Sequence, residues 1–386
     1  MNKVSDIQLA DNSVISLHAQ LHNQLRHLIL SGRWASGTRI PSENQLTNHL
    51  KISRSTIRLA LQQAEIEGLI ARVAGRGTFV AYTASQERGR RLIAFVVSDL
   101  DTENNLFMLN GAESKARASG YQIIFSHGQS QQEEIEILTG LSEEENIAGV
   151  LLWPNATEPQ NRAKIAASYA GFVFPIVTMD RQVEGYDCDF VTSDNYGGAY
   201  ALMQHLVELG HTQIAFLSHH QIGLQPVAER YRAYCDVLTE AGLIPHDPWI
   251  IGQPGNEISV TKALRSSVDN KSPELQQIKD HVLKAETRPT AIFGVNDYIA
   301  ILAMRAIKLL ELPVPEEISI AGFDDSYLAA HLEVPLTTVA QDSFLIGKHA
   351  AELLIDRLEG YVGPSRCEII PVQLRLRSST SMVECV

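Results

Sequence analysis

The chain has 386 residues, of which 45% are hydrophobic and 20% are charged, and its formal net charge is −13. This length predicts two or three domains. The sequence has no apolar run near the roughly 18 residues of a membrane span, and its first residues lack the apolar core of a signal peptide. Its four cysteines form no Cys-x-x-Cys pair, which argues against a zinc site and against a disulfide framework. We therefore expect a cytoplasmic protein without membrane contact.

The charge is divided unevenly along the chain. Residues 1–91 hold 12 Lys and Arg against 6 Asp and Glu, a net charge of +6, whereas the remaining residues hold 20 against 39, a net charge of −19. A basic head on an acidic body is typical of a nucleic-acid-binding module joined to a part that binds no nucleic acid. We call residues 1–82 the head and residues 92–386 the body. The polar, basic stretch 83–91 has no periodicity and is expected to be a linker.

Apolar periodicity in the head predicts three helices and then two short strands. Ser42 can cap the second helix, and Gly32 and Gly68 can end the first and third. The expected helices cover residues 17–31, 42–50 and 54–67, and the expected strands cover 69–73 and 77–82. A helix-turn-helix followed by a glycine-tipped hairpin is a winged helix.

The start of the third helix is polar and cationic. In a helix-turn-helix, the second helix of the motif enters the major groove with its N-terminal residues against the base edges. Arg54 and Arg58 lie four residues apart, so both project from one face, and an arginine can contact guanine with two hydrogen bonds. Ser55 and Thr56 have short hydroxyl side chains that can reach phosphates. The alternative is a helical hairpin with an ordinary solvated face.

The expected wing carries charge at its tip. Gly75 and Gly77 allow the backbone to approach a minor groove, and Arg72 and Arg76 supply positive charge there.

The head closely resembles the GntR family of bacterial winged-helix transcription regulators. The resemblance is carried by "LILSGRWASGTRIPSENQLTNHLKISRSTIRLALQQAEIEGLIARVAGRGTFV" and covers about residues 14–81. It implies double-stranded operator DNA as a partner. The DNA-contacting positions that it implies, with neighbouring candidates, are Arg54, Ser55, Thr56, Arg58, Gly75, Arg76, Ser42 and Asn44. The family usually has Arg or Lys where Asn44 stands, so we expect the operator to be read differently at that position.

The body alternates between apolar runs and helical patterns. Continuous apolar strands separated by helices predict parallel sheets covered on both faces, an α/β fold. The expected strands lie in 92–97, 121–126, 149–153, 175–179, 213–217, 291–295 and 318–323. The expected helices cover about 106–119, 131–141, 158–171, 195–209, 226–242, 296–311 and 343–359.

Polar residues follow several of these strands, at the edge of the sheet where ligands of such folds bind. Asn296 and Asp297 follow one strand, Asp324 follows another, and Asp180 with Arg181 follows a third. Carboxylates and amides beside arginine suit a neutral polyhydroxylated ligand, because each hydroxyl both donates and accepts hydrogen bonds.

Trp153, at the end of a further strand, could stack on the apolar face of a sugar. The structural alternatives are that Asn296 and Asp324 only cap helices and that Trp153 belongs to the core.

The body resembles the effector-binding core of the lactose/galactose repressor family, which is similar to periplasmic sugar-binding proteins. The resemblance spans about residues 92–378. It is carried by "NLFMLNGAESKARASGY", "VTSDNYGGAYALMQHLVELGHTQIAFL", "ERYRAY" and "FGVNDYIAILAMRAIKLLELPVPEEISIAGFDDSYLAAHLEVPLTTVAQDSFLIGKHAAELL". It implies that Arg230, Asp297 and Gln341 bind the effector, with Asn296 beside them. The family motif has Gly where Ala233 stands here, and Arg232 competes with Arg230 for the same role.

The resemblance also implies two lobes, between which the chain crosses near 192–193, 341–342 and 372. Lobe one would hold about 92–192 and 342–371, and lobe two about 193–341 and 372–386. A GntR-type head on such a body resembles the arabinose-responsive repressors of Gram-positive bacteria. This architecture implies a homodimeric transcription repressor that a small carbohydrate such as arabinose releases from operator DNA.

Other functions are weighed against this one, and a sugar-binding protein without a regulatory role is disfavoured by the DNA-binding pattern of the head. Some chains with a GntR-type head carry a pyridoxal-phosphate enzyme body, which needs a Schiff-base lysine with an Asp or Arg partner. The lysines here lie in polar helices and the body is too short, so we expect neither an enzyme nor a cofactor. A regulator that responds to a non-sugar small molecule also stays open. His219 and His220 are adjacent without a third ligand in view, so we expect no metal site.

Overall fold

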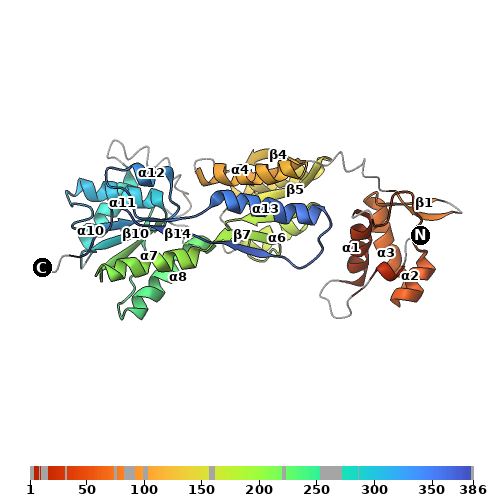
Figure 1. Cartoon of the computed structure of the whole chain (residues 1–386), viewed down its shortest axis with the longest axis horizontal. Coiled ribbons are helices and arrows are strands. Elements are labelled where there is room, and N and C mark those ends of the chain that lie inside the picture. Colours follow the sequence, from red (N-terminus) through yellow and green to blue (C-terminus); the bar gives the residue numbers. More distant parts are fainter. Residues whose placement is uncertain are drawn as a thin grey trace.

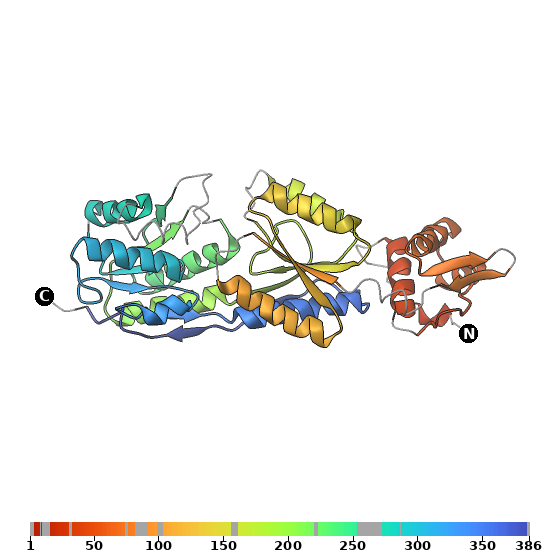
Figure 2. The same ribbon diagram turned by 90° about the horizontal axis from the view of Figure 1, so that it is seen from above.

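The computed structural model describes residues 4–7, 9, 16–30, 33–73, 76–81, 92–98, 103–155, 161–219, 223–252, 272–285 and 287–383. The expected linker 83–91, Gly32, Gly75 and His220 lie outside these residues. The head lies at one end of the molecule and the two lobes of the body follow in a row (Figures 1 and 2). In the described ranges, no helix is both long enough and apolar enough to cross a membrane.

The head is the expected winged helix. Its core gathers apolar side chains from all three helices and the wing, among them Leu21, Leu25, Ile57 and Leu61, each at most 2% exposed. Its elements are η1 (Val4–Asp6), α1 (Leu17–Leu30), α2 (Glu43–Leu50), α3 (Arg54–Ile66), β1 (Ile70–Val73) and β2 (Gly77–Val80). Strands β1 and β2 pair antiparallel.

Side-chain caps fix the turn between α2 and α3. Ser42 accepts a hydrogen bond from the backbone of Gln45, whose side chain bonds back to the Ser42 backbone, which satisfies two free donors of the first turn. Ser53 caps α3 by accepting from the Thr56 backbone. Lys51 ends α2 with a φ of 55°, in the left-handed region. These local bonds set the angle at which α3 leaves the turn.

The first lobe is built on a six-stranded parallel sheet with strand order β13-β7-β6-β5-β3-β4. Buried side chains form one cluster on each face of this sheet. Its strands are β3 (Leu92–Val97), β4 (Gln122–His127), β5 (Ile147–Trp153), β6 (Ile176–Met179), β7 (Asp189–Ser193) and β13 (Cys367–Ile370). Its helices are α4 (Glu103–Ala118), α5 (Gln131–Glu143), α6 (Arg162–Ala170) and α13 (Ser343–Leu358).

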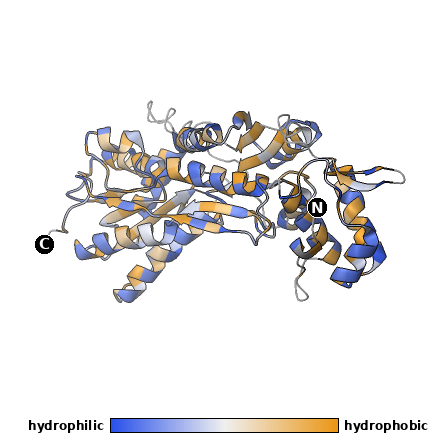
Figure 3. Cartoon of the chain, turned by 45° about the vertical axis from the view of Figure 1, so that its right-hand side comes forward, coloured by the Kyte–Doolittle hydropathy of each residue, from blue (hydrophilic) through white to orange (hydrophobic). Residues whose placement is uncertain are grey.

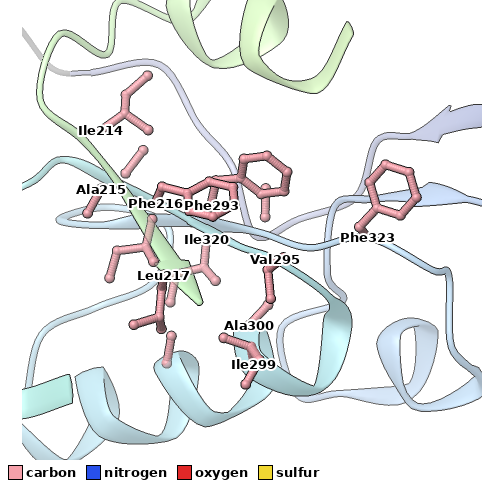
Figure 4. Packing of buried hydrophobic residues seen from close by; sticks show 14 of the residues in the cluster. Ile214, Ala215, Phe216, Leu217, Phe293, Val295, Ile299, Ala300, Ile320 and Phe323 are labelled. Carbon is pink, nitrogen blue, oxygen red and sulfur yellow. The ribbon is translucent and has the colours of Figure 1, made fainter. Parts of the chain in front are cut away.

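The second lobe has a four-stranded parallel sheet with strand order β11-β10-β8-β9 and a separate antiparallel pair, β12 with β14. Phe216 and Phe293 meet edge to face in its core, and Phe323 lies at the margin of this group (Figure 4). The strands are β8 (Ile214–His219), β9 (Trp249–Ile251), β10 (Ala291–Gly294), β11 (Ser319–Ala321), β12 (Thr338–Ala340) and β14 (Gln373–Arg375). The helices are α7 (Asn195–Glu208), α8 (Gln225–Glu240), α10 (Pro273–Lys284), α11 (Asp297–Leu309) and α12 (Tyr327–His331).

The chain passes between the lobes three times. It leaves the first sheet after β7 and enters α7 of the second lobe, returns between β12 and α13, and leaves again between β13 and β14. The domain limits expected from the sequence stay a prediction. In Figure 3, the strands at the centre of the body are largely apolar, and the helices carry both apolar and polar residues. The helices therefore cover the sheets with their apolar faces, which produces the layers.

Among the residues that the structure describes, the α-helices α10 and α12 and the short 3-10 helix η1 were not expected from the sequence, and five strands were missed as well. The missed strands are β7, β9, β12, β13 and β14. The helix expected over 158–171 is α6, and residues 156–160 lie outside the described part of the chain.

Helices α4 and α13 cross at two glycines. A Cβ atom at Gly347 would lie 1.8 Å from the Met108 carbonyl oxygen, and one at Gly111 would lie 1.9 Å from the Phe344 carbonyl oxygen. Both neighbours are backbone atoms, so they cannot rotate away. Only glycine fits at this crossing.

Gly347→Ala is therefore expected to lower the free energy of unfolding by at least about 1–3 kcal/mol, because the helices must separate. Gly140, in α5, is the matched control, since a Cβ there meets nothing within 4 Å. Gly140→Ala should instead stabilise the protein by about 0.5–1 kcal/mol. Urea unfolding of the full chain measures both values, and equal effects of the two substitutions would contradict the packing described.

Candidate functional site

The start of α3 presents the candidate DNA-binding residues on the surface of the head. Arg54, Ser55 and Arg58 are exposed, and Thr56 is half-buried. Arg58 donates from Nε to Glu43 of α2 at 3.0 Å. The hydroxyl of Ser53 lies 2.7 Å from those of Ser55 and Thr56. Arg54 is thus the more available guanidinium, whereas Arg58 must leave Glu43 to reach a base.

The neighbouring candidates take different positions. Ser42 is occupied in the capping box, and Asn44 is exposed on α2. Arg76 is exposed at the wing, whereas Arg72 pairs with Glu65 at 3.2 Å. Whether these residues contact DNA stays a prediction.

Arg39 is a basic residue near the wing that the sequence reading did not single out. A Cβ atom added to Gly77 would lie 2.7 Å from Arg39 Nε, so this guanidinium rests against the wing backbone. Gly77 has a φ of 111°, which a residue with a side chain adopts only with strain. The only signal in the sequence was a further arginine just before the Ile-Pro-Ser-Glu run.

In the body, the candidate effector residues gather where the strands of both sheets end. Arg230 of α8 is the centre of this group and is 5% exposed. Its Nε donates to Asn195 at 2.9 Å and its Nη1 donates to the Val295 carbonyl at 2.7 Å. The guanidinium lies 3.7 Å from the centre of the Phe323 ring. Contacts within the protein therefore hold Arg230 in one orientation.

The third nitrogen of Arg230 faces a carboxylate. Nη2 lies 3.7 Å from Oδ1 of Asp324, which also accepts a hydrogen bond from Gln341 at 2.8 Å. Gln341 in turn accepts from the Ser193 hydroxyl at 2.8 Å. Burial raises the pKa of Asp324 well above its ordinary value, although Arg230 opposes this shift. Asp324 has a φ of 119°, a strained conformation of the kind found at functional sites.

Arg232 does not share this environment. It is exposed, and its guanidinium stacks on Tyr196 at 4.4 Å. The geometry therefore favours Arg230 for the effector role that the sequence left open between the two.

Trp153 and Asp180 come from the first lobe. The Trp153 side chain is 6% exposed and its indole N–H donates to Asp180 at 3.1 Å. The Arg181 guanidinium covers the Trp153 ring at 4.6 Å and donates to the Pro154 carbonyl at 3.3 Å. A sugar could stack on Trp153 only after Arg181 moved. The alternative reading of Trp153 as a core residue fits this placement better.

Asn296 and Asp297 begin α11. Asn296 accepts from the Ile299 backbone at 2.9 Å, which is the helix cap considered as its alternative role. Asp297 is fully buried and accepts from the Ser326 backbone at 2.6 Å and from the Thr338 hydroxyl at 2.5 Å. Both oxygens of Asp297 thus accept hydrogen bonds from residues of the second lobe. A direct contact from Asp297 to an effector stays a prediction.

Burial raises the pKa of Asp297 to about 7. The folded protein therefore holds this proton more tightly than the unfolded chain does. The resulting stability is fully present below pH of about 4 and is lost as the pH rises through about 7.

Asp297→Asn keeps a neutral side chain at every pH and removes this dependence. Between pH 4 and 7, the free energy of unfolding of the wild type should fall relative to that of the variant by up to about 1.4 kcal/mol per pH unit. Urea unfolding at pH 5 and pH 8 measures the difference. Parallel pH profiles for the two proteins would show that Asp297 stays ionised.

No group of His, Cys, Asp and Glu suited to a metal ion occurs among the residues that the structure describes. Of the expected histidine pair, only His219 is described.

The geometry agrees with two family matches. Residues 17–80 match the bacterial regulatory proteins of the gntR family, and residues 203–380 match the periplasmic binding protein-like domain. The chain is 29% identical over 361 residues to the arabinose metabolism transcriptional repressor of Geobacillus stearothermophilus, covering 89% of this chain and 91% of that protein. It is 27% identical over 252 residues to the HTH-type transcriptional repressor PurR of Aliivibrio salmonicida, covering 65% and 70%.

Among solved structures, a putative ribose operon repressor from Burkholderia thailandensis is similar with a TM-score of 0.60 at 25% identity, over 74% of this chain and 98% of that one. These matches place a DNA-binding head and an effector-type body in one polypeptide. The chain therefore joins a domain that matches the gntR family of bacterial regulatory proteins to a domain that matches the periplasmic binding protein-like domain.

Proposed function

We propose that this protein is a repressor that binds operator DNA as a dimer and leaves it when a small neutral carbohydrate binds between the two lobes. The observation that carries the proposal is the chain of contacts from Arg230 through Asp324 to Gln341 and Ser193. Gln341 and Ser193 lie where the chain passes between the lobes. A ligand that contacts Arg230 and Asp324 would therefore act directly on the segments that connect the two lobes.

The charges around Arg230 favour a neutral ligand. Asp324, Asp180 and Asp297 all lie close enough to act electrostatically on its guanidinium. Arg230 already faces the carboxyl group of Asp324, so an anionic ligand such as a sugar phosphate would compete with that group for the guanidinium, whereas sugar hydroxyls can accept from arginine and donate to a carboxyl oxygen. Arabinose is the first candidate because two similar proteins are named arabinose metabolism repressors. A non-sugar effector is the second candidate, because PurR repressors are also similar.

The surface of the first lobe supports a dimer. Leu106 and Phe107 of α4 are 62% and 51% exposed, and Phe125 of β4 is 44% exposed. Strand β4 is an edge of its sheet and lies beside α4 (Figure 1). Exposed apolar groups at a sheet edge are typical of an interface between copies. A dimer would present two α3 helices to a two-fold operator in the bacterial cytoplasm.

A thermal-shift screen tests this proposal, with L-arabinose, D-ribose, D-xylose, D-ribose 5-phosphate and hypoxanthine as ligands. A neutral pentose at 100 times its dissociation constant should stabilise the body by about 2.7 kcal/mol. Stabilisation by hypoxanthine alone would identify a non-sugar regulator. Stabilisation by the sugar phosphate alone would contradict the charge argument.

A further inference from the structure

Two elements of the first lobe run from the candidate effector residues toward the head. Helix α13 begins two residues after Gln341 and ends two residues before Gly360. Its 16 residues span about 24 Å at roughly 1.5 Å per residue. Strand β7 runs in the same lobe from Asp189 to Ser193, and Ser193 bonds to Gln341. The two elements thus meet at the effector end.

They meet again at the opposite end through an arginine cluster. Asp189, at the first residue of β7, has a side chain only 1% exposed and pairs with Arg357 at 2.7 Å and with Arg366 at 2.9 Å. Burial raises the pKa of Asp189, but the hydrogen bonds from Arg357 and Arg366 outweigh it and the pKa lies below its ordinary value. Asp189 is therefore a fixed charge that joins β7 to the end of α13.

The same arginines hold the turn that follows α13, residues 359–364, which we name the α13 turn. Arg357 donates to the carbonyls of Gly363 at 2.7 Å and Pro364 at 3.0 Å. The ring of Tyr361 lies 4.7 Å from the Arg357 guanidinium and 4.1 Å from that of Arg366. Because these contacts connect the α13 turn to Arg357 and Arg366, which also bind Asp189, we expect the turn to move together with β7 and α13.

The α13 turn contacts the head. Nδ1 of His27, on α1, donates to the Gly360 carbonyl at 2.9 Å. Gly360 has a φ of 107°, and a Cβ atom there would lie 2.9 Å from His27 Nδ1, so glycine permits this approach. Helix α1 is the part of the head nearest the first lobe in both views (Figures 1 and 2). It also packs directly against α3, which carries Arg54.

We propose that the α13 turn is the surface on which the body docks the head, with the Gly360 carbonyl bound to His27, and that α13 and β7 carry the effector signal to it. This inference rests on the proposed function for the existence of an effector. Helix α13 and strand β7 form the path between the candidate effector residues and the head. Movement of Gln341 and Ser193 on ligand binding would shift both elements and the α13 turn at their far end. A bistable contact of this kind couples two sites when the ligand favours one arrangement.

The first test measures operator DNA affinity of the full chain by fluorescence anisotropy, with and without L-arabinose. Loss of one hydrogen bond should lower the ratio of the two affinities by about two- to tenfold in His27→Ala. The affinity of the free protein for L-arabinose should stay unchanged. His27→Asn should restore the ratio, because its amide N–H can occupy the place of Nδ1–H. His18→Ala is the matched control, since His18 lies on the same helix and bonds to Ser16 instead.

The second test needs no effector and uses hydrogen exchange of the backbone amides in residues 359–364 of the full chain. Exchange should be faster in His27→Ala than in the wild type and unchanged in His18→Ala. Equal exchange in all three proteins would overturn the docking contact, and a wild-type affinity ratio in His27→Ala would overturn its role in signalling. If the wild type responds to no ligand of the thermal-shift screen, the proposed function fails, and hydrogen exchange alone decides whether the head docks here.

Discussion

Arg230→Ala is expected to weaken L-arabinose binding about ten- to a hundredfold, so that the protein stays on operator DNA at sugar concentrations that release the wild type. The guanidinium is fixed by Asn195 and Val295 and faces Asp324 with its remaining nitrogen. A charged hydrogen bond to a sugar hydroxyl contributes about 1.5–3 kcal/mol, which corresponds to this loss of affinity. Without sugar, the folded variant should bind DNA as the wild type does.

The substitution also removes a buried charge, so the stability of the variant must be measured beside its function. It leaves the Val295 carbonyl and Asp324 without this partner, which lowers the free energy of unfolding by several kcal/mol in comparable buried pairs. Sugar titrations are therefore made at a temperature where circular dichroism shows the variant folded. Arg232→Ala is the matched control, because it removes an exposed arginine two positions along the same helix. Loss of the sugar response in Arg232→Ala and not in Arg230→Ala would show that Arg232 binds the sugar.

Arg54→Ala is expected to lower the affinity for operator DNA by about 1–3 kcal/mol and to reduce discrimination against scrambled DNA. Arg54 is exposed at the first position of α3, where a recognition helix meets base edges. The fold should be unaffected, because the core of the head uses the opposite face of α3, with Ile57 and Leu61.

Anisotropy with a duplex that the wild type selects from a random pool measures this effect. Arg33→Ala is the control, since Arg33 is an exposed arginine of the head outside α3 that faces Asp6 at 3.5 Å. Equal losses of affinity in the two variants would mean that α3 does not read the operator but that the charge of the head alone binds DNA.

The head could be predicted almost completely from the sequence because its signals are local. Ser42 and Ser53 cap helices through bonds to residues three positions away, and the apolar spacing of α3 matches its buried face. The missed strands of the body had no such signal. β7 reads Asp-Phe-Val-Thr-Ser, and its two ends, Asp189 and Ser193, find their partners Arg357, Arg366 and Gln341 more than 140 residues away. β12 and β14 are each three residues long, which is too short for the alternation of apolar and polar residues of a strand to be recognised in the sequence.

For the candidate effector site, the sequence suggested the central residue and not its surroundings. The resemblance pointed to Arg230, and Asn195 and Phe323 also lie in stretches that carry it, but they are 35 and 93 positions away and nothing in the sequence showed that they contact this arginine. The sequence could not show that Arg181 covers Trp153 or that both oxygens of Asp297 are already used. Those facts depend on packing between strands that are distant in the chain.

Release of operator DNA by a sugar is tested by measuring the affinity of the full-length protein for its selected operator duplex as L-arabinose is added at constant ionic strength. We expect the sugar to weaken DNA binding by at least tenfold. Saturating operator should weaken L-arabinose binding by the same factor, since coupling between two binding sites is reciprocal. If L-arabinose binds the protein and leaves its affinity for the operator unchanged, the protein is not a repressor that this sugar releases from DNA.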